Sequence, residues 1–96
     1  MTRTAELDVH NKSGLHARPA AMFVRAAAAF RSTISVQNLT RESKSANAKS
    51  LIAVLGCGVE HGHRILISAD GEDEVTAIEA LQGLAESGFG EAVTHS

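Results

Sequence analysis

The feature that most constrains the fold of this 96-residue chain is the order in which two kinds of hydrophobic pattern follow one another. Apolar and polar residues alternate at 5–9 and at 33–37, as in strands that are buried on one face. Apolar residues recur at helical spacing after residue 20 and again after residue 75. The mixture predicts an α+β domain in which helices pack on a sheet.

We expect the element order β-α-β-β-α-β-α, with a four-stranded, mainly antiparallel sheet and three helices on one of its faces. A polar stretch near 42–46 is expected to form a weak third strand, and 64–69 a strong fourth one. The run 51–55 follows Ser50 and precedes glycine, which favours a short capped helix over a buried strand.

The last helix is expected to start in an acidic turn at 72–74 and to end at Gly88. Its predicted apolar stripe consists of Val75, Ile78, Leu81 and Leu84.

Composition excludes several classes of function. An apolar content of 44% favours a folded globule, and a net charge of −2 with 3% aromatic residues argues against nucleic-acid partners and anionic membranes. The chain contains no apolar run of transmembrane length and no signal-peptide core, and its one cysteine, Cys57, cannot form an intramolecular disulfide. We therefore expect a cytoplasmic domain at 1–91 with a flexible tail at 92–96.

The segment 13–20, Ser-Gly-Leu-His-Ala-Arg-Pro-Ala, carries the strongest chemical signal. Pro19 is the only proline and suits the first turn of a helix, where its missing N–H costs nothing. Unpaired N–H groups and the positive end of the helix dipole attract anions such as phosphate. His16 can carry a phosphoryl group there, and the fork-shaped guanidinium of Arg18 can pair with its oxygens.

Two stretches together resemble the HPr family, the histidine-containing phosphocarriers of the bacterial phosphoenolpyruvate-dependent sugar phosphotransferase system. Segment 13–20 resembles the active-site signature of that family, and segment 47–55 resembles its regulatory serine segment. Weaker similarities occur at Gly62, at 70–74 and at 88–91. The resemblance spans nearly the whole chain and implies the open-faced β-sandwich of the family.

The resemblance implies that His16 accepts a phosphoryl group on Nδ1 from phosphorylated enzyme I and passes it to an enzyme IIA component. Arg18 would be the partner of the phosphate. A neutral imidazole is a competent nucleophile at cytoplasmic pH, and phosphoryl transfer asks the protein mainly for positioning and charge compensation. Such a carrier is a co-substrate of other enzymes rather than a free-standing catalyst, and we expect it to need no cofactor and no metal.

The resemblance also implies a regulatory site at Ser50, a target of HPr kinase/phosphorylase in many bacteria, with a catabolite regulator as a further partner. In the family the surface at Leu51, Ile52 and Leu55 docks partners together with the histidine region. The segment between Phe30 and Ser50 is a few residues longer than in compact members, which predicts an extended turn at 38–45. Glu91 matches a glutamate that often ends family sequences. Five residues follow it here, so we do not expect Glu91 to pair with the arginine through a terminal carboxylate.

Two other interpretations stay open. One is a regulatory paralogue of the nitrogen-related phosphotransferase branch, which would use the same histidine in another circuit. The other is an interaction module that binds a kinase or a transcription regulator without carrying phosphoryl flux. His61 and His63 form a His-x-His pair, which we interpret as a polar turn rather than a metal site because no third ligand is placed beside them. We expect a monomer, because a small shuttle binds its partners weakly.

Overall fold

The computed structural model describes residues 2–91, which form four strands and three helices. The strands are β1 (Thr2–Asp8), β2 (Thr33–Asn38), β3 (Ala46–Asn47) and β4 (Arg64–Asp70). The helices are α1 (Ala17–Ala28), α2 (Leu51–Gly56) and α3 (Glu74–Glu86), so the observed order is β-α-β-β-α-β-α as predicted. The predicted tail at 92–96 lies outside the described residues.

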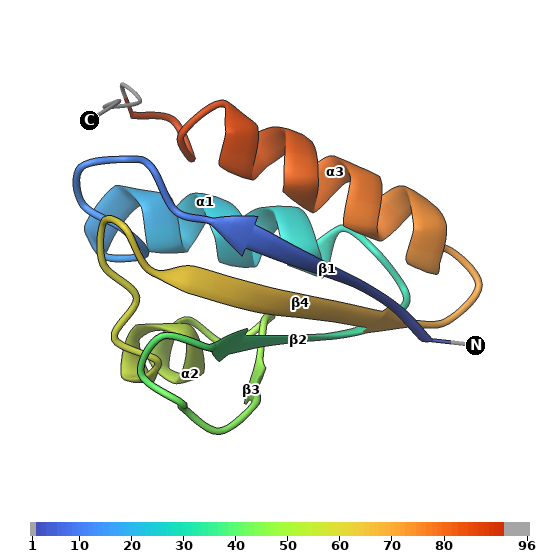
Figure 1. Ribbon diagram of the computed structural model, residues 1–96. Helices are drawn as coiled ribbons and strands as arrows, with labels where there is room; N and C mark the ends of the chain where they lie inside the picture. Colours follow the sequence, from blue (N-terminus) through green and yellow to red (C-terminus); the bar gives the residue numbers. More distant parts are fainter. Residues whose placement is uncertain (1, 92–96) are drawn as a thin grey trace.

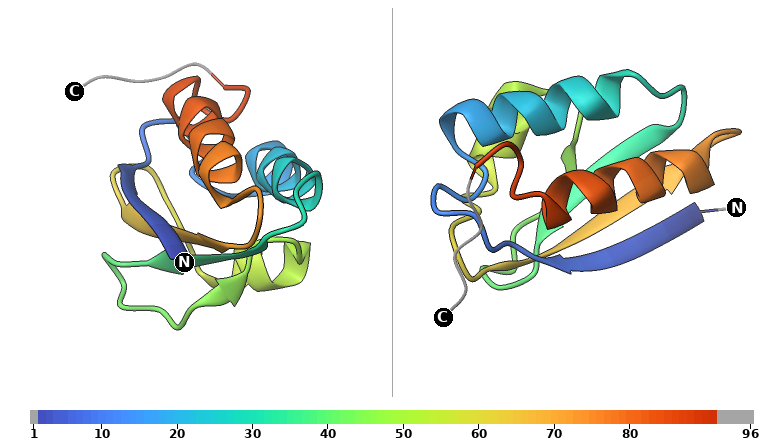
Figure 2. Two further views of the ribbon diagram at one scale, coloured as in Figure 1. Left: turned by 90° about the vertical axis from the view of Figure 1, so that its right-hand side faces the viewer. Right: turned by 90° about the horizontal axis from the view of Figure 1, so that it is seen from above.

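The strands form one antiparallel sheet in the order β1-β4-β2-β3 (Figure 1). Ile67 in β4 lies opposite Ala5 in β1 and Val36 in β2, so apolar side chains of three strands face the same side. Helices α1 and α3 cover this side, as the end-on view in Figure 2 shows. The result is a two-layer, open-faced sandwich whose core lies between the sheet and these two helices.

The short helix α2 lies beside the β2–β3 edge and contacts both β3 and α1 (Figures 1 and 2). The hydroxyl oxygen of Ser50 accepts a hydrogen bond from the Ala53 N–H at 3.3 Å, which confirms the predicted N-cap. One residue of the helix, Val54, is fully buried against the core. The helix presents Leu51, Ile52 and Leu55 to solvent.

Two details differ from the sequence prediction. Strand β3 comprises only Ala46–Asn47, whereas we expected it near 42–46. Its partners Ser35 and Val36 in β2 set the position, and the polar residues before it form turns instead. In α3, Val75 is 43% exposed, because the buried face consists of Ala77, Ile78, Leu81 and Ala85. Alanines occupy two positions of this face, so the face is centred away from Val75.

Candidate functional site

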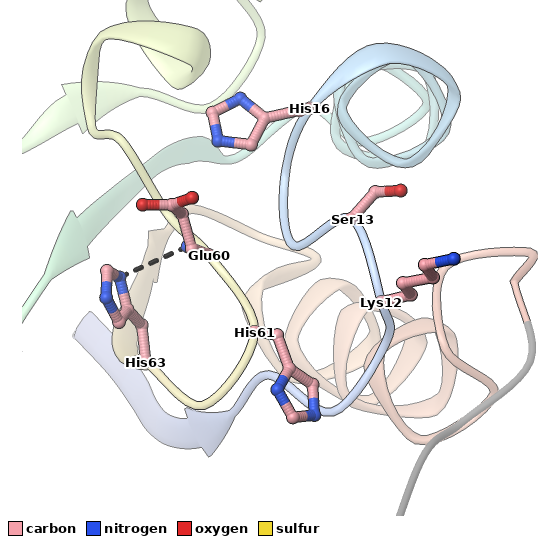
Figure 3. Close-up of a pocket in the computed structure, with 6 residues that line it drawn as sticks. All are labelled: Lys12, Ser13, His16, Glu60, His61 and His63. Carbon is pink, nitrogen blue, oxygen red and sulfur yellow. Dashed lines mark hydrogen bonds between the residues drawn. The ribbon is translucent and has the colours of Figure 1, made fainter.

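His16 is the N-cap residue of α1, with an extended backbone at φ −129° and ψ 158°. Within residues 2–91 its imidazole makes no capping hydrogen bond to the first turn, although polar N-cap side chains commonly do. The residue is half-buried, and its ring projects from the start of α1 toward an open pocket (Figure 3). The histidine is therefore held by its backbone while its ring is available to react.

The backbone next to this histidine adopts an unusual conformation. Ala17 has a φ of +50°, in the left-handed region that residues with a Cβ rarely occupy. Such outliers cost free energy and gather at functional sites, where the surrounding structure keeps them in place. This observation, independent of the histidine itself, marks the start of α1 as the candidate site.

Arg18 lies on the first turn of α1, two residues after His16, and its side chain is exposed. It is not among the residues that line the pocket beneath the imidazole. Pro19 is buried in the same turn, where we predicted it. The sequence-predicted pair therefore shares one helix end, with His16 at the pocket and Arg18 exposed to solvent.

The pocket has a volume of about 560 Å³ and is formed by two loops that are distant in the sequence. The loop before α1 contributes two residues besides His16, and the loop between α2 and β4 contributes three (Figure 3). The lining residues are Lys12, Ser13, His16, Glu60, His61 and His63. Sequence reasoning missed the second loop as part of the site, because no local signal connects it with His16.

His63 has a structural role in the second loop. Its Nδ1 accepts a hydrogen bond from the Glu60 N–H at 3.1 Å, so the neutral ring carries its proton on Nε2. The amide nitrogen of the buried Asn38 lies 3.1 Å from the same Nδ1, and the Glu60 carboxylate pairs with Arg41 at 2.8 Å.

No cluster of three or more metal-ligating side chains occurs within residues 2–91.

The loop before α1 packs directly against the second loop. Gly14 has a φ of +59°, and its α-carbon lies against the backbone of Val59 and Glu60, where a Cβ would collide. The next residue, Leu15, is fully buried and donates its N–H to the Val59 carbonyl oxygen at 3.0 Å. The glycine is therefore required at this position both for its conformation and for its lack of a side chain.

The Glu91 side chain reaches the same loop. Its carboxylate accepts hydrogen bonds from the Asn11 amide at 3.0 Å, the Ser13 N–H at 3.0 Å and the Ser13 hydroxyl at 2.8 Å. These donors, the Asn11 amide first, hold the pKa of Glu91 below its ordinary value. Glu91 thus reaches the candidate site through its side chain, which binds the loop before the histidine.

Helix α2 presents an exposed apolar surface, which we call the α2 surface: Leu51, Ile52 and Leu55. Their exposed fractions are 43%, 85% and 38%. Helix α2 contacts α1 and lies at the same end of the molecule as the start of α1 (Figures 1 and 2), which His16 caps. Apolar side chains that are this exposed on a small domain are typical of a partner-binding surface.

None of the helices within residues 2–91 has the length and the apolar character that a membrane span requires.

Comparison with known proteins gives a consistent result. The family model described as "PTS HPr component phosphorylation site" matches residues 3–87. The phosphocarrier protein HPr of Haemophilus influenzae is 46% identical over 79 residues, which cover 82% of this chain and 89% of that protein. The crystal structure of HPr-C-His from Thermoanaerobacter tengcongensis superposes with a TM-score of 0.88 at 44% identity, over 95% of this chain and 99% of that one.

A second group of relatives is much longer. The multiphosphoryl transfer protein of Haemophilus influenzae is 46% identical over 86 residues, which cover 90% of this chain but only 17% of that protein. The match of fold, of family model and of sequence over most of the chain leads to one conclusion. The chain is a member of the HPr family of the phosphotransferase system.

Proposed function

We propose that the chain is a phosphocarrier that accepts a phosphoryl group on His16 from phosphorylated enzyme I and passes it to an enzyme IIA component. The observation that carries the proposal is the placement of His16. Its backbone caps α1, and its imidazole ring lines an open pocket. Family membership supports the choice of partners.

In the proposed reaction the lone pair of the neutral imidazole Nδ1 attacks phosphorus. The new P–N bond forms while the bond between phosphorus and the donor atom of enzyme I breaks. The N–H groups of the first turn of α1 and the Arg18 guanidinium then compensate the charge of the phosphoryl oxygens. Transfer to enzyme IIA reverses these roles, so the chain is a co-substrate of two enzymes.

The direct test is incubation with phosphoenolpyruvate and enzyme I, followed by a search for acid-labile phosphate on the chain. We expect one labelled histidine and no label in H16A. Acid-labile label on H16A would refute the assignment. R18K keeps the positive charge but loses the fork-shaped donor set, so we expect it to accept phosphate more slowly than the wild type.

We further propose that Ser50 is a regulatory phosphorylation site. Its hydroxyl caps α2, so a phosphate there would lie at the positive end of the helix and next to the α2 surface. Added charge beside exposed apolar side chains would oppose docking of enzyme I through desolvation and repulsion. HPr kinase/phosphorylase with ATP should give acid-stable phosphate that is absent in S50A.

A partner assay separates the sugar circuit from the nitrogen-related branch and from a pure interaction module. Transfer from the labelled chain to enzyme IIA of a sugar system supports the first, and exclusive transfer to nitrogen-related components supports the second. Binding to a kinase or a catabolite regulator without any transfer supports the third. On the proposal the chain acts in the cytoplasm as a monomer, which sedimentation at micromolar concentration tests.

A further inference from the structure

Three hydrogen bonds connect the end of the described chain with the loop that carries His16. The Glu91 carboxylate accepts all three, from donors 78 and 80 positions earlier in the sequence. One oxygen binds the Asn11 amide and the Ser13 N–H, and the other binds the Ser13 hydroxyl. The Glu91 side chain therefore binds three hydrogen-bond donors of the turn immediately before the candidate site.

The backbone that carries Glu91 is itself firmly packed. Phe89 is fully buried and meets Phe23 of α1 edge-to-face, with ring centroids 6.0 Å apart. Gly90 has a φ of +87° and lies against the sulfur of Met22, where a Cβ would collide. The Glu91 N–H donates to the Gly88 carbonyl oxygen at 2.9 Å. The carboxylate is thus a fixed point relative to α1.

From this fixed point, contacts lead to His16 through the turn. The fully buried Asn11 uses its amide nitrogen both for Glu91 and for the Gly14 carbonyl oxygen, at 2.7 Å. Its Oδ1 has no hydrogen-bond partner within residues 2–91, so the amide is oriented by those donor bonds. Gly14 in turn packs on the second pocket loop and precedes Leu15 and His16.

We propose that Glu91 is a positioning residue for phosphoryl transfer at His16, because its hydrogen bonds fix the position and the orientation of the turn that precedes the histidine. The proposal rests on the proposed phosphocarrier function. Phosphoryl transfer depends on in-line geometry, and a displacement of about 1 Å can cost up to about 100-fold in rate. Loss of the carboxylate should therefore lower the rate of transfer within the docked complex and leave docking by the α2 surface unchanged.

The chain offers a matched control at the other end of α1. The Asp73 carboxylate also accepts three hydrogen bonds, from the N–H groups of Arg31 and Ser32 and from the Ser32 hydroxyl. It joins the segment after α1 to the start of α3 and is not among the residues that line the His16 pocket. D73N and E91Q each replace a three-bond carboxylate by an amide, but only E91Q changes the turn before His16.

The experiment measures phosphoryl transfer from phosphorylated enzyme I to wild type, E91Q, E91D and D73N as a function of carrier concentration. Urea midpoints and hydrogen exchange at the Ser13 amide are measured on the same samples. We expect E91Q to lower kcat by about tenfold with KM within about twofold of the wild type and faster exchange at Ser13. E91D keeps the charge but has a shorter side chain, so its kcat should lie between those of E91Q and the wild type. D73N should lose stability and keep the wild-type kcat.

Each outcome decides the matter. Wild-type kcat in both E91Q and E91D overturns the positioning role, and so does an equal loss of kcat in E91Q and D73N. If E91Q fails to fold, E91D carries the comparison, with a lowered kcat supporting the role and a wild-type kcat refuting it. Failure of the wild type to accept phosphate, in contrast, removes the phosphocarrier proposal, and the role of Glu91 in transfer falls with it.

Discussion

Asp73 binds Ser32 through both of the donors that this serine offers, its backbone N–H at 2.9 Å and its hydroxyl. The same carboxylate accepts the Arg31 N–H at 2.8 Å. The loop after α1 and the first turn of α3 are therefore joined by one side chain, although 41 and 42 positions separate the partners. Ser32 is buried, so its donors would otherwise be left without water.

The first prediction concerns the stability of the fold at acidic pH. Hydrogen bonds from the Ser32 hydroxyl, then from the Arg31 and Ser32 N–H groups, lower the pKa of Asp73 from 3.8 to about 2. A carboxylate with a lowered pKa stabilises the fold fully above its unfolded-state pKa, and this contribution is lost as the pH falls through the folded-state value. We expect the Asp73 contribution to disappear between about pH 4 and pH 2.

The measurement is the difference in unfolding free energy between wild type and D73N, from urea titrations at pH 2 to 7. The difference should be constant above pH 5 and shrink toward pH 2. The pKa values of Asp8 and Glu91 are also lowered, but their contributions cancel in this comparison. A difference that does not change with pH would show that Asp73 is not the titrating group.

The second prediction separates capping from charge at Ser50. S50A removes the acceptor for the Ala53 N–H and should lower the unfolding free energy by about 1 kcal/mol. S50D keeps an N-cap acceptor, so we expect it to stay within about 0.5 kcal/mol of the wild type. It should nevertheless slow acceptance at His16 by about tenfold, because a charge next to the α2 surface opposes docking. Equal acceptance rates in S50D and wild type would contradict this.

The third prediction tests the α2 surface with Ile52, which is 85% exposed. I52S should change the unfolding free energy by less than about 0.5 kcal/mol, as surface substitutions usually do. Its KM as a carrier for enzyme I should rise about tenfold, because central apolar residues of an interface contribute most to affinity. V75S, at an exposed valine on α3, is the matched control and should leave KM unaltered. A similar KM for both variants would place docking elsewhere.

The fourth prediction compares two glycines. G14A combines a left-handed backbone with a collision against the Val59 carbonyl, so we expect a loss of more than about 1 kcal/mol. In contrast, Gly83 lies in the interior of α3, where an added Cβ would meet no atom within 4 Å beyond the neighbouring backbone of its own helix, and G83A should stabilise the fold by about 0.5–1 kcal/mol. Thermal unfolding of both variants checks the opposite signs.

Local patterns were enough to predict most of the fold. The strand predicted at 64–69 occurs at Arg64–Asp70, and the serine cap places the start of α2 correctly. The error at β3 arose because two residues cannot form a recognisable pattern, and pairing with Ser35 and Val36 decides where they lie. Val75 was misplaced because the predicted stripe counted only large apolar residues, whereas Ala77 and Ala85 share the buried face with Ile78 and Leu81.

The candidate site was predictable only where its residues are neighbours in the sequence. Proline and helix spacing around His16 indicate the start of α1. The wall formed by Glu60 and His63, and the carboxylate of Glu91, come from other parts of the chain. Tertiary packing brings them to the loop that carries His16, and such packing leaves no signal in a single sequence.

The contact between Ser13 and Glu91 also has a consequence for biosynthesis. The two residues are 78 positions apart, so at about 5–20 residues per second the ribosome adds Glu91 roughly 4–16 s after Ser13. During that interval the segment around His16 is complete in sequence but lacks the carboxylate that orders it. On the proposed positioning role, a fragment that stops before Glu91 would therefore still dock on enzyme I but would accept the phosphoryl group more slowly than the finished molecule.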